Sequence, residues 1–445
     1  MAQGAIWLAL RERLGPTLFL GYEGTEATGE LLALVKDGAE VAAAETGETV
    51  EALFDRTPFY AESGGQAGDR GEIEWPGGRA EVVDAKKEAG DLSAHVLKIA
   101  AGRLEVGARA RLAVDAERRA RTRLNHSAAH LAHAALKHVL GPHVAQKGQL
   151  VDGERMRFDF SHGAPLTPAQ IDAIETEVNA VIRQNLPALT EEMAPEAAIE
   201  AGAVALFGEK YGDSVRVLTL GHDLAEADAP YSVELCGGTH VARTGDIALF
   251  KIVSEQGIAA GVRRIEALTG EPARRWLLDQ AAIARGLADQ FRTPVAEVPA
   301  RVEALQTQAK KLERELADAK RQLAVGGGAG GGAAEVEEVG GVKFIGRVLE
   351  GVGGKDLRPI AETFRKQLPD GVIVLNGVLD GKVANTVVVT GSAQARFSAV
   401  DLARTAVAAM GGQGAGGKPD FAQGGAPDGA KAADGIAAVK AALAA

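Results

Sequence analysis

Two short motifs that lie far apart in the chain constrain its fold more than any other feature. The first is HSAAH at residues 126–130, and the second is CGGTH at residues 236–240, which contains the only cysteine among 445 residues. Each motif places two good metal ligands four positions apart, and one thiolate with three imidazoles is a ligand set that suits zinc. Neither half alone holds an ion firmly. We therefore expect the fold to gather one Zn²⁺ per chain between His126, His130, Cys236 and His240.

The length and composition bound the class of protein. A chain of 445 residues exceeds the usual limit for a single core, so two to four domains are expected. One cysteine excludes a disulfide framework and is typical of a reducing cytosol, so we expect a cytoplasmic protein. The first 30 residues show no signal-peptide pattern, and no run of about 18 apolar residues predicts a membrane span.

The formal net charge of −11 argues by itself against a nucleic-acid partner. Its distribution is uneven, because Arg118, Arg119, Arg121 and Arg123 gather just before the first motif. Two interpretations stay open for this strip: a solvated helix face, or a set of phosphate contacts beside the metal.

The pattern of residues predicts a multidomain α+β protein. Residues 15–112 alternate β-formers with Gly and Asp turns and indicate a small β-barrel. Residues 115–140 predict a helix, which Asp115 caps and Gly141-Pro142 ends, so that His126 and His130 share one face. A strand at 231–235 runs directly into Cys236, and two glycines allow a tight turn there.

The second half of the chain reads as helix, linker and a separate α/β unit. Residues 271–325 are helical with a break at Thr293-Pro294, and Val302 begins a heptad seam over three repeats that predicts a coiled coil, closed either internally or with a second chain. Glycines at 326–332 indicate a flexible linker. A glycine-rich segment at 411–425 is either an anion-binding loop or a loop of no special role. The predicted domains are 1–112, 113–270, 271–332 and 333–445.

Three interpretations of the metal site differ in chemistry: a catalytic or substrate-positioning zinc, a structural zinc, and no metal. Three of the four expected ligands are histidines, and the ligands join a helix face to a glycine-rich strand end. Both features favour the catalytic or substrate-positioning zinc. Such an ion would serve ester or amide hydrolysis. The sequence indicates no Ser-His-Asp set and contains no His-Glu-x-x-His motif.

Several strings together carry a resemblance to a known family. They are residues 57–66, 125–130, 146–148 and 206–213, the Cys236 motif, residues 261–266 and the late glycine-rich segment. In order and spacing they resemble the C-terminal half of bacterial alanyl-tRNA synthetase over nearly the whole chain.

The resemblance implies a barrel, an editing domain, a helical spacer and a terminal tRNA-binding domain. It implies zinc-dependent hydrolysis of tRNA(Ala) wrongly charged with serine or glycine, with zinc on the four ligands above. Gln146 matches a family glutamine of the editing pocket, and Gly64, Gly65 and Gln66 match a glycine-rich motif that reaches toward that pocket. Partners would be the acceptor end and elbow of tRNA(Ala), with a possible homodimer through the C-terminal region.

Two sets of residues complete the expected site. A pocket that accepts serine and rejects alanine needs a polar partner for the serine hydroxyl, and Gln146, Ser63 and Thr239 are the candidates. Phosphate contacts are expected from the arginine strip at 118–123 and from Lys210, Arg263, Arg264 and Lys418.

Departures from the family keep alternatives open. The family often has Thr before the second zinc-site histidine, where this chain has Ala129. The missing hydroxyl and β-branch would either enlarge the amino-acid pocket or loosen the discrimination of serine. No class II catalytic domain is recognisable, so we expect no aminoacylation, whether the chain is a fragment or a free-standing editor. The alternative function is a non-catalytic tRNA-binding and dimerisation module with a structural zinc. A phosphoesterase would need an aspartate-rich metal centre, and the sequence has none.

Overall fold

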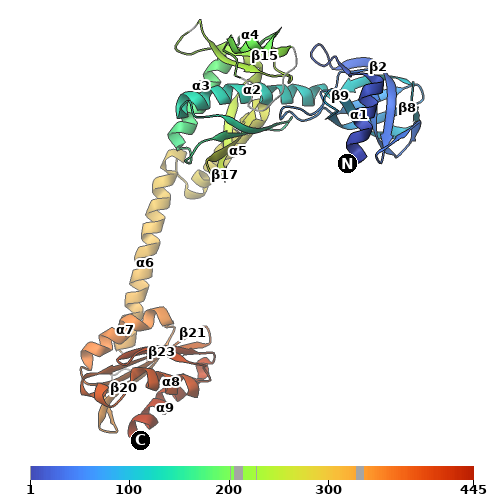
Figure 1. Cartoon of the computed structure of the whole chain (residues 1–445). Coiled ribbons are helices and arrows are strands. Elements are labelled where there is room, and N and C mark those ends of the chain that lie inside the picture. Colours follow the sequence, from blue (N-terminus) through green and yellow to red (C-terminus); the bar gives the residue numbers. More distant parts are fainter. Residues whose placement is uncertain (1, 201, 205–213, 227, 327–334) are drawn as a thin grey trace. The chain divides into compact units, whose positions relative to one another are not determined.

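The computed structural model describes residues 2–200, 202–204, 214–226, 228–326 and 335–445 (Figure 1). The chain divides into two compact units, residues 1–283 and 284–445, which are taken in turn below. Within the described residues, none of the helices combines the length and the apolar character that a membrane crossing requires.

A closed antiparallel barrel occupies the start of the first unit. Six strands follow one another around it in the order β11-β7-β8-β9-β5-β2, and β11 pairs with β2 to close the ring. The small barrel that the sequence predicts is therefore confirmed. The strands are β2 (Glu26–Lys36), β5 (Thr49–Phe54), β7 (Gly71–Trp75), β8 (Gly78–Glu88), β9 (Leu92–Ala101) and β11 (Arg109–Val114), with β3 (Ala39–Val41) added beside β2.

A bulge in β2 lets one strand serve two cores. The register with β5 shifts between Leu31 and Ala33, so that Leu31 and Leu34 enter the barrel while Ala33 faces outward. Trp7 of helix α1 (Ala2–Leu14) packs against that outer face. Short pairs complete this region: β1 (Leu18–Phe19) with β6 (Arg56–Thr57), and β4 (Ala43–Glu45) with β10 (Arg103–Glu105).

Helix α2 (Ala116–Leu140) leads from the barrel into a second α+β layer (Figure 1). The carboxylate of Asp115 accepts from the backbone N–H of Arg118 at 2.9 Å, and the helix ends at Gly141, as the sequence predicts. Alanines such as Ala128 and Ala132 are fully buried and allow close packing against the sheets. His126, His130 and His133 of α2 therefore lie in the interior of the unit, whereas His138, near the end of the helix, is exposed.

Two antiparallel sheets pack around α2. The first has the order β12 (Gln146–Val151), β13 (Met156–Ser161), β18 (Val262–Thr269) and β17 (Phe250–Ala259). The second has the order β14 (Leu189–Met193), β15 (Val215–His222) and β16 (Pro230–Leu235). Helix α3 (Pro168–Arg183) begins at a capping box of Thr167 and Gln170, and α4 (Pro195–Glu200) and η1 (Thr244–Ile247) are short.

The helical stretch comprises α5 (Gly270–Phe291), η2 (Val295–Glu297) and α6 (Val298–Gly326), with the predicted break near Pro294. Along α6 the predicted seam is exposed: Leu312 is 55% exposed and Leu316 is 58% exposed. The coiled coil therefore stays a prediction. Most of the predicted glycine linker, from residue 327 on, lies outside the described residues.

The second unit contains a six-stranded sheet with helices on both faces (Figure 1). Its order is β19 (Glu337–Val339), β20 (Val342–Glu350), β21 (Gly371–Leu379), β22 (Lys382–Thr390), β24 (Phe421–Ala426) and β23 (Ala415–Lys418), and β20 and β21 are parallel. Val372 and Val374 face a core with α8 (Ala399–Ala409) and α9 (Ala432–Ala444). Ile373 faces α7 (Gly354–Gln367) on the other side. Short turns η3 (Gly391–Ala395) and η4 (Gly429–Lys431) link these elements.

The late glycine-rich segment is ordered as a hairpin. Residues 415–418 pair with 421–424 as β23 and β24, at one edge of the sheet. A loop without secondary structure is therefore the wrong description of this segment, because its glycines allow the close β approach that larger residues would block. Gly417 has a φ of +153°, and a Cβ added to it would lie 2.3 Å from the carbonyl oxygen of Phe421.

A buried histidine in the barrel makes folding depend on pH. His95 Nδ1 donates to the carbonyl of Ala52 at 3.0 Å, and its Nε2 accepts from the hydroxyl of Thr57 at 2.7 Å. Burial lowers its pKa to about 4, so the ring is neutral in the fold.

The direction of the pH dependence follows from the difference between the pKa of His95 in the folded and in the unfolded chain. The unfolded chain takes up a proton near the ordinary histidine pKa of 6.5, whereas the folded barrel does not until about pH 4. Stability is therefore fully present above pH 6.5 and falls by about 3 kcal/mol as the pH drops to 4. Urea unfolding of wild type and His95→Gln across this pH range measures the loss of stability. Parallel curves of unfolding free energy against pH for the two proteins would contradict the role of His95.

Candidate metal centre and its pocket

The four predicted metal ligands lie together. The ligand atoms of His126, His130, Cys236 and His240 are all within 4.8 Å of one another. Two come from one face of α2, and two come from the turn that follows β16. The backbone N–H of Cys236 donates to the carbonyl of Arg216 at 3.0 Å, which fixes the end of that strand beside β15.

The three imidazoles are oriented through their Nδ1 atoms. His126 Nδ1 donates to Gln66 Oε1 at 2.8 Å, His130 Nδ1 donates to the carboxylate of Glu234, and His240 Nδ1 lies 3.1 Å from Ser127 Oγ. This arrangement leaves each Nε2 free to face the sulfur. Nε2 of His240 and of His126 lie 3.2 Å and 3.6 Å from Cys236 Sγ.

Gln66 connects the barrel to both halves of the ligand set. Its Oε1 also accepts from the backbone N–H of Thr239 at 2.9 Å, and its Nε2 donates to the Thr239 hydroxyl at 2.8 Å. The backbone donor settles which way the amide points, because only an oxygen can accept from it. Gly65, at φ +82°, permits this reach, since an added Cβ would lie 2.6 Å from the carbonyl of Gln149.

In the second motif, position 238 requires glycine for a similar steric reason. A Cβ at this position would lie 2.2 Å from Cε1 of His126. A side chain at residue 238 would therefore displace one ligand, which explains physically why the CGGTH turn needs glycine.

The charges around Cys236 favour its thiolate form. Burial raises the pKa of the Cys236 thiol, but His126, His240 and His130 lower it by a larger amount. The pKa is therefore well below its ordinary value. Burial likewise opposes the charged form of His130, while Glu234 and Cys236 raise its pKa to about 10. Burial lowers the pKa of His240 to about 3. A thiolate is the form of cysteine that binds a metal.

Glu234 is a buried carboxylate that the sequence analysis missed. Burial raises its pKa, but His130 and His133 lower it more strongly, so the carboxylate is ionised. Its second oxygen lies 2.6 Å from His133 Nδ1. Glu234 stands two residues before Cys236 on β16, so the period-two alternation of a strand could have placed both on one face.

The residues present fit a zinc ion. The donor set is one sulfur and three nitrogens, as zinc prefers, and it is held by outer hydrogen bonds. His130 Nε2 is buried and has no hydrogen-bond partner among the described residues, although it lies in the ligand group. An ion bonded to this nitrogen would satisfy it.

A pocket of about 450 Å³ opens beside the ligands. The wall includes His126, His130 and Cys236 of the metal group, and also Ser63, Gly64 and Gln146. Of the predicted site residues, Gly65, Gln66 and Thr239 are not among the lining residues, and Gln66 is fully buried. Ala129 is part of the hydrophobic core and is not among the lining residues, so its effect on the pocket stays a prediction.

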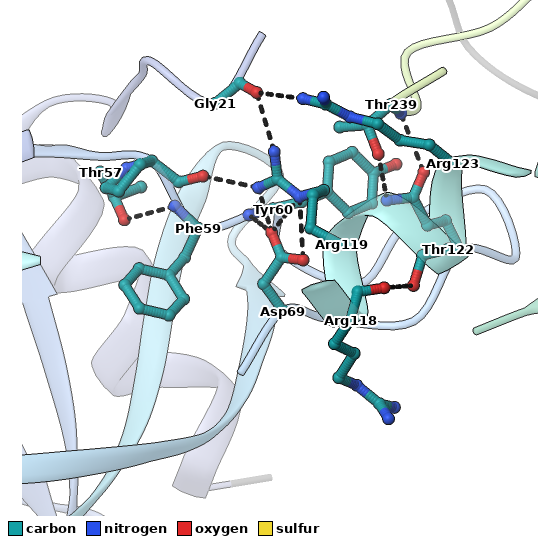
Figure 2. A network of polar contacts seen from close by, with 12 residues as sticks. Gly21, Thr57, Phe59, Tyr60, Asp69, Arg118, Arg119, Thr122, Arg123 and Thr239 are labelled. Atoms are coloured by element: carbon teal, nitrogen blue, oxygen red, sulfur yellow. Dashed lines mark hydrogen bonds and ion pairs between the residues drawn. The ribbon is translucent and has the colours of Figure 1, made fainter. Parts of the chain in front are cut away.

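The arginine strip divides into buried and surface members. Arg119 is 1% exposed and donates to the Gly21 carbonyl at 2.8 Å, to the Pro58 carbonyl at 2.7 Å and to the carboxylate of Asp69 (Figure 2). This side chain joins α2 to the barrel, and its burial keeps it from a phosphate at the surface, which corrects the expectation for Arg119.

The other expected phosphate contacts lie nearer the surface. Arg121 pairs with Glu117 at 2.5 Å, and the half-buried Arg123 donates to Gly21 at 3.4 Å. Ion pairs also hold two more arginines, Arg263 with Glu255 and Arg264 with Asp159. Arg118 is half-buried and Lys418 is exposed on β23, while Lys210 lies outside the described residues.

Comparison with known proteins gives matches along the whole chain. Residues 5–118 match the family of class II (A) tRNA synthetases, residues 215–266 match the second additional domain of threonyl and alanyl tRNA synthetases, and residues 341–445 match the DHHA1 domain. The second of these ranges contains Cys236 and His240. Alanine–tRNA ligase of Caulobacter sp. (strain K31) is 67% identical over 99% of this chain and 50% of the ligase.

This chain corresponds to the C-terminal half of alanyl-tRNA synthetase. The ligase of Hyphomonas neptunium is 52% identical over 98% of the chain, again covering 50% of the ligase. The chain thus spans about half the length of these curated relatives. The crystal structure of the C-Ala domain from Aquifex aeolicus alanyl-tRNA synthetase matches 25% of the chain and 99% of that domain, at 24% identity and a TM-score of 0.24. That score is too low to support an argument about the fold.

The ligand set predicts a metal stoichiometry. We expect one zinc per chain after dialysis, its loss in Cys236→Ala, and about 10- to 100-fold weaker zinc binding in Glu234→Gln, because the carboxylate orients His130. Elemental analysis and chelator competition measure both. His138→Gln, an exposed histidine on the same helix, serves as the control, and full zinc retention by Cys236→Ala would contradict the assignment.

The Arg119–Asp69 pair predicts a large effect on stability. Arg119→Met leaves the Asp69 carboxylate buried without its partner, which costs about 3–5 kcal/mol. Arg121→Met, four-tenths exposed and two positions along the same helix, is expected to change the free energy of unfolding by less than about 0.5 kcal/mol. Denaturant unfolding compares the two variants, and equal losses would show that Arg119 does not join α2 to the barrel.

Proposed function

We propose that this chain hydrolyses the ester of wrongly charged tRNA(Ala), removing serine or glycine from the 3′-terminal adenosine. The observation that carries the proposal is the pocket itself, because its wall combines three metal-group residues with Ser63 and Gln146. Support for tRNA as the substrate comes from the relatives, which are alanine–tRNA ligases, and from the matched domain of threonyl and alanyl tRNA synthetases.

The proposed reaction is an ester hydrolysis. The oxygen of a water molecule attacks the ester carbonyl carbon, the bond from that carbon to the ribose oxygen breaks, and the ribose oxygen takes a proton. A zinc ion held by His126, His130, Cys236 and His240 would supply Lewis-acid polarisation. The burial of His126, His130 and Glu234 in the wall of the pocket would strengthen the polar contacts made there.

Two side chains are proposed to recognise the serine hydroxyl. Ser63 and Gln146 line the pocket, whereas the Thr239 hydroxyl is buried and accepts from Gln66. A hydrogen bond between neutral groups is worth about 0.5–1.5 kcal/mol, so strong rejection of alanine requires both contacts. Among the described residues, Gln146 Nε2 donates to Gln149 Oε1 at a long distance of 3.4 Å, so this amide can also donate to a ligand.

A second candidate is a non-catalytic module that binds tRNA and dimerises, with zinc as a structural ion. The exposed seam on α6 favours it, because Leu312, Leu316 and Leu323 together form an apolar stripe in the described structure. The two candidates differ in turnover. The second unit, with Lys418 on its sheet edge, is proposed to contact the tRNA elbow in either case.

The test is release of the amino acid from Ser-tRNA(Ala), Gly-tRNA(Ala) and Ala-tRNA(Ala). We expect wild type to release serine and glycine in preference to alanine, and Cys236→Ala to be slower by at least about a hundredfold, since metal polarisation contributes several kcal/mol. His138→Gln should match wild type. Equal rates for wild type and Cys236→Ala would rule out the metal, and tRNA binding without release would favour the module.

A further inference from the structure

One cation in the pocket wall has no role in the metal group. Arg216 lies on β15, and its carbonyl accepts from the backbone N–H of Cys236, so its position is fixed beside the ligand set. On the barrel side of the same pocket lies Tyr22. Residues from two domains therefore meet next to the proposed zinc.

The guanidinium of Arg216 is held over an aromatic ring. Its Cζ lies 3.2 Å from the ring centroid of Tyr22, and the Tyr22 hydroxyl donates to the carbonyl of Gly237 at 2.5 Å. The ring is thus tied to the CGGTH turn and covers one face of the guanidinium. Stacking of this kind leaves the N–H groups at the edge of the plane to meet an anion.

Two of the three guanidinium nitrogens have no hydrogen-bond partner in the described part of the chain. Nε and Nη1 of Arg216 are both buried and unbonded. Glu192, which lies opposite Arg216 in the β14–β15 register, forms no ion pair with it among the described residues. Buried charged donors without partners are costly, so a site that keeps two of them is arranged for a ligand.

The acids of the pocket are already engaged, so its free charge is positive. Glu234 holds His130 and His133, and Asp91 pairs with Arg11. Lys87 also lines the pocket, is exposed, and has no ion pair among the described contacts. Among the described lining residues, the charges without an ion pair are therefore those of Arg216 and Lys87.

We propose that Arg216, backed by Tyr22, binds the phosphodiester that joins the last two nucleotides of the RNA, with Lys87 as a weaker second contact. The inference rests on the proposed deacylase function, because the aminoacyl ester carries no negative charge of its own and the phosphodiester is the nearest anion to it. Arg216 is a positioning residue: it fixes the terminal adenosine so that the ester lies at the metal group.

Binding of stable substrate analogues tests this proposal apart from turnover. The probes are 3′-serylamino-3′-deoxyadenosine and the same compound carrying a 5′-methyl phosphate, whose amide replaces the ester. Calorimetry gives the affinity ratio of the two probes for each protein. Wild type should bind the phosphorylated probe about 10- to 100-fold more tightly, as expected for a charge-assisted contact.

The variants separate this contact from a structural one. Arg216→Gln should bind both probes about equally, Arg216→Lys should keep part of the preference, and Arg275→Gln, an exposed arginine on α5, should behave as wild type. The zinc content and melting temperature of each variant show whether it is folded. If Arg216→Gln is misfolded, Tyr22→Leu and Arg216→Lys take its place in the comparison. A phosphate preference that persists in folded Arg216→Gln, or its absence in wild type, would overturn the proposal.

Failure of the proposed function gives a different pattern. If the chain does not release serine from tRNA but the phosphate preference depends on Arg216, the anion site stands and the catalytic assignment falls. If release occurs and Arg216→Gln leaves the preference intact, the reverse holds.

Discussion

The structure depends on how three imidazole rings are turned. Each ring is held at Nδ1 by an oxygen from a different element: Gln66 from the barrel, Glu234 from β16 and Ser127 from α2. The three Nε2 atoms therefore converge near one sulfur. If these outer contacts were absent, free rotation of the rings would scatter the donors, and a single ion would meet a much weaker site.

This orientation requires the barrel and the second layer to be joined. Arg119 makes that joint, since one buried guanidinium binds Asp69 and two barrel carbonyls while its backbone belongs to α2. Gln66 then reaches both ligand pairs through His126 and Thr239. The pocket that results has a metal group at one part of its wall and an unpaired arginine at another, which suits a ligand with both an ester and a phosphate.

Much of this arrangement could be predicted from the sequence, for identifiable reasons. The helix at 116–140 followed from its cap and periodicity, and the four ligands followed from residue type and spacing. Arg119 could not be placed, because a buried arginine and a surface arginine look alike in one sequence until Asp69, 50 positions earlier, is known to lie beside it. Arg216 and Tyr22 stayed hidden for the same reason, since they stack only after two domains have packed together. The glycine-rich segment near residue 415 looked like a loop because glycine has low strand propensity, whereas close backbone approach favours it there.

X-ray absorption at the zinc edge of the purified chain measures the ligand set itself. We expect one sulfur at about 2.3 Å and three nitrogen ligands at about 2.0 Å. A first shell without sulfur, a shell with more than one sulfur, or a protein that takes up no zinc would contradict it.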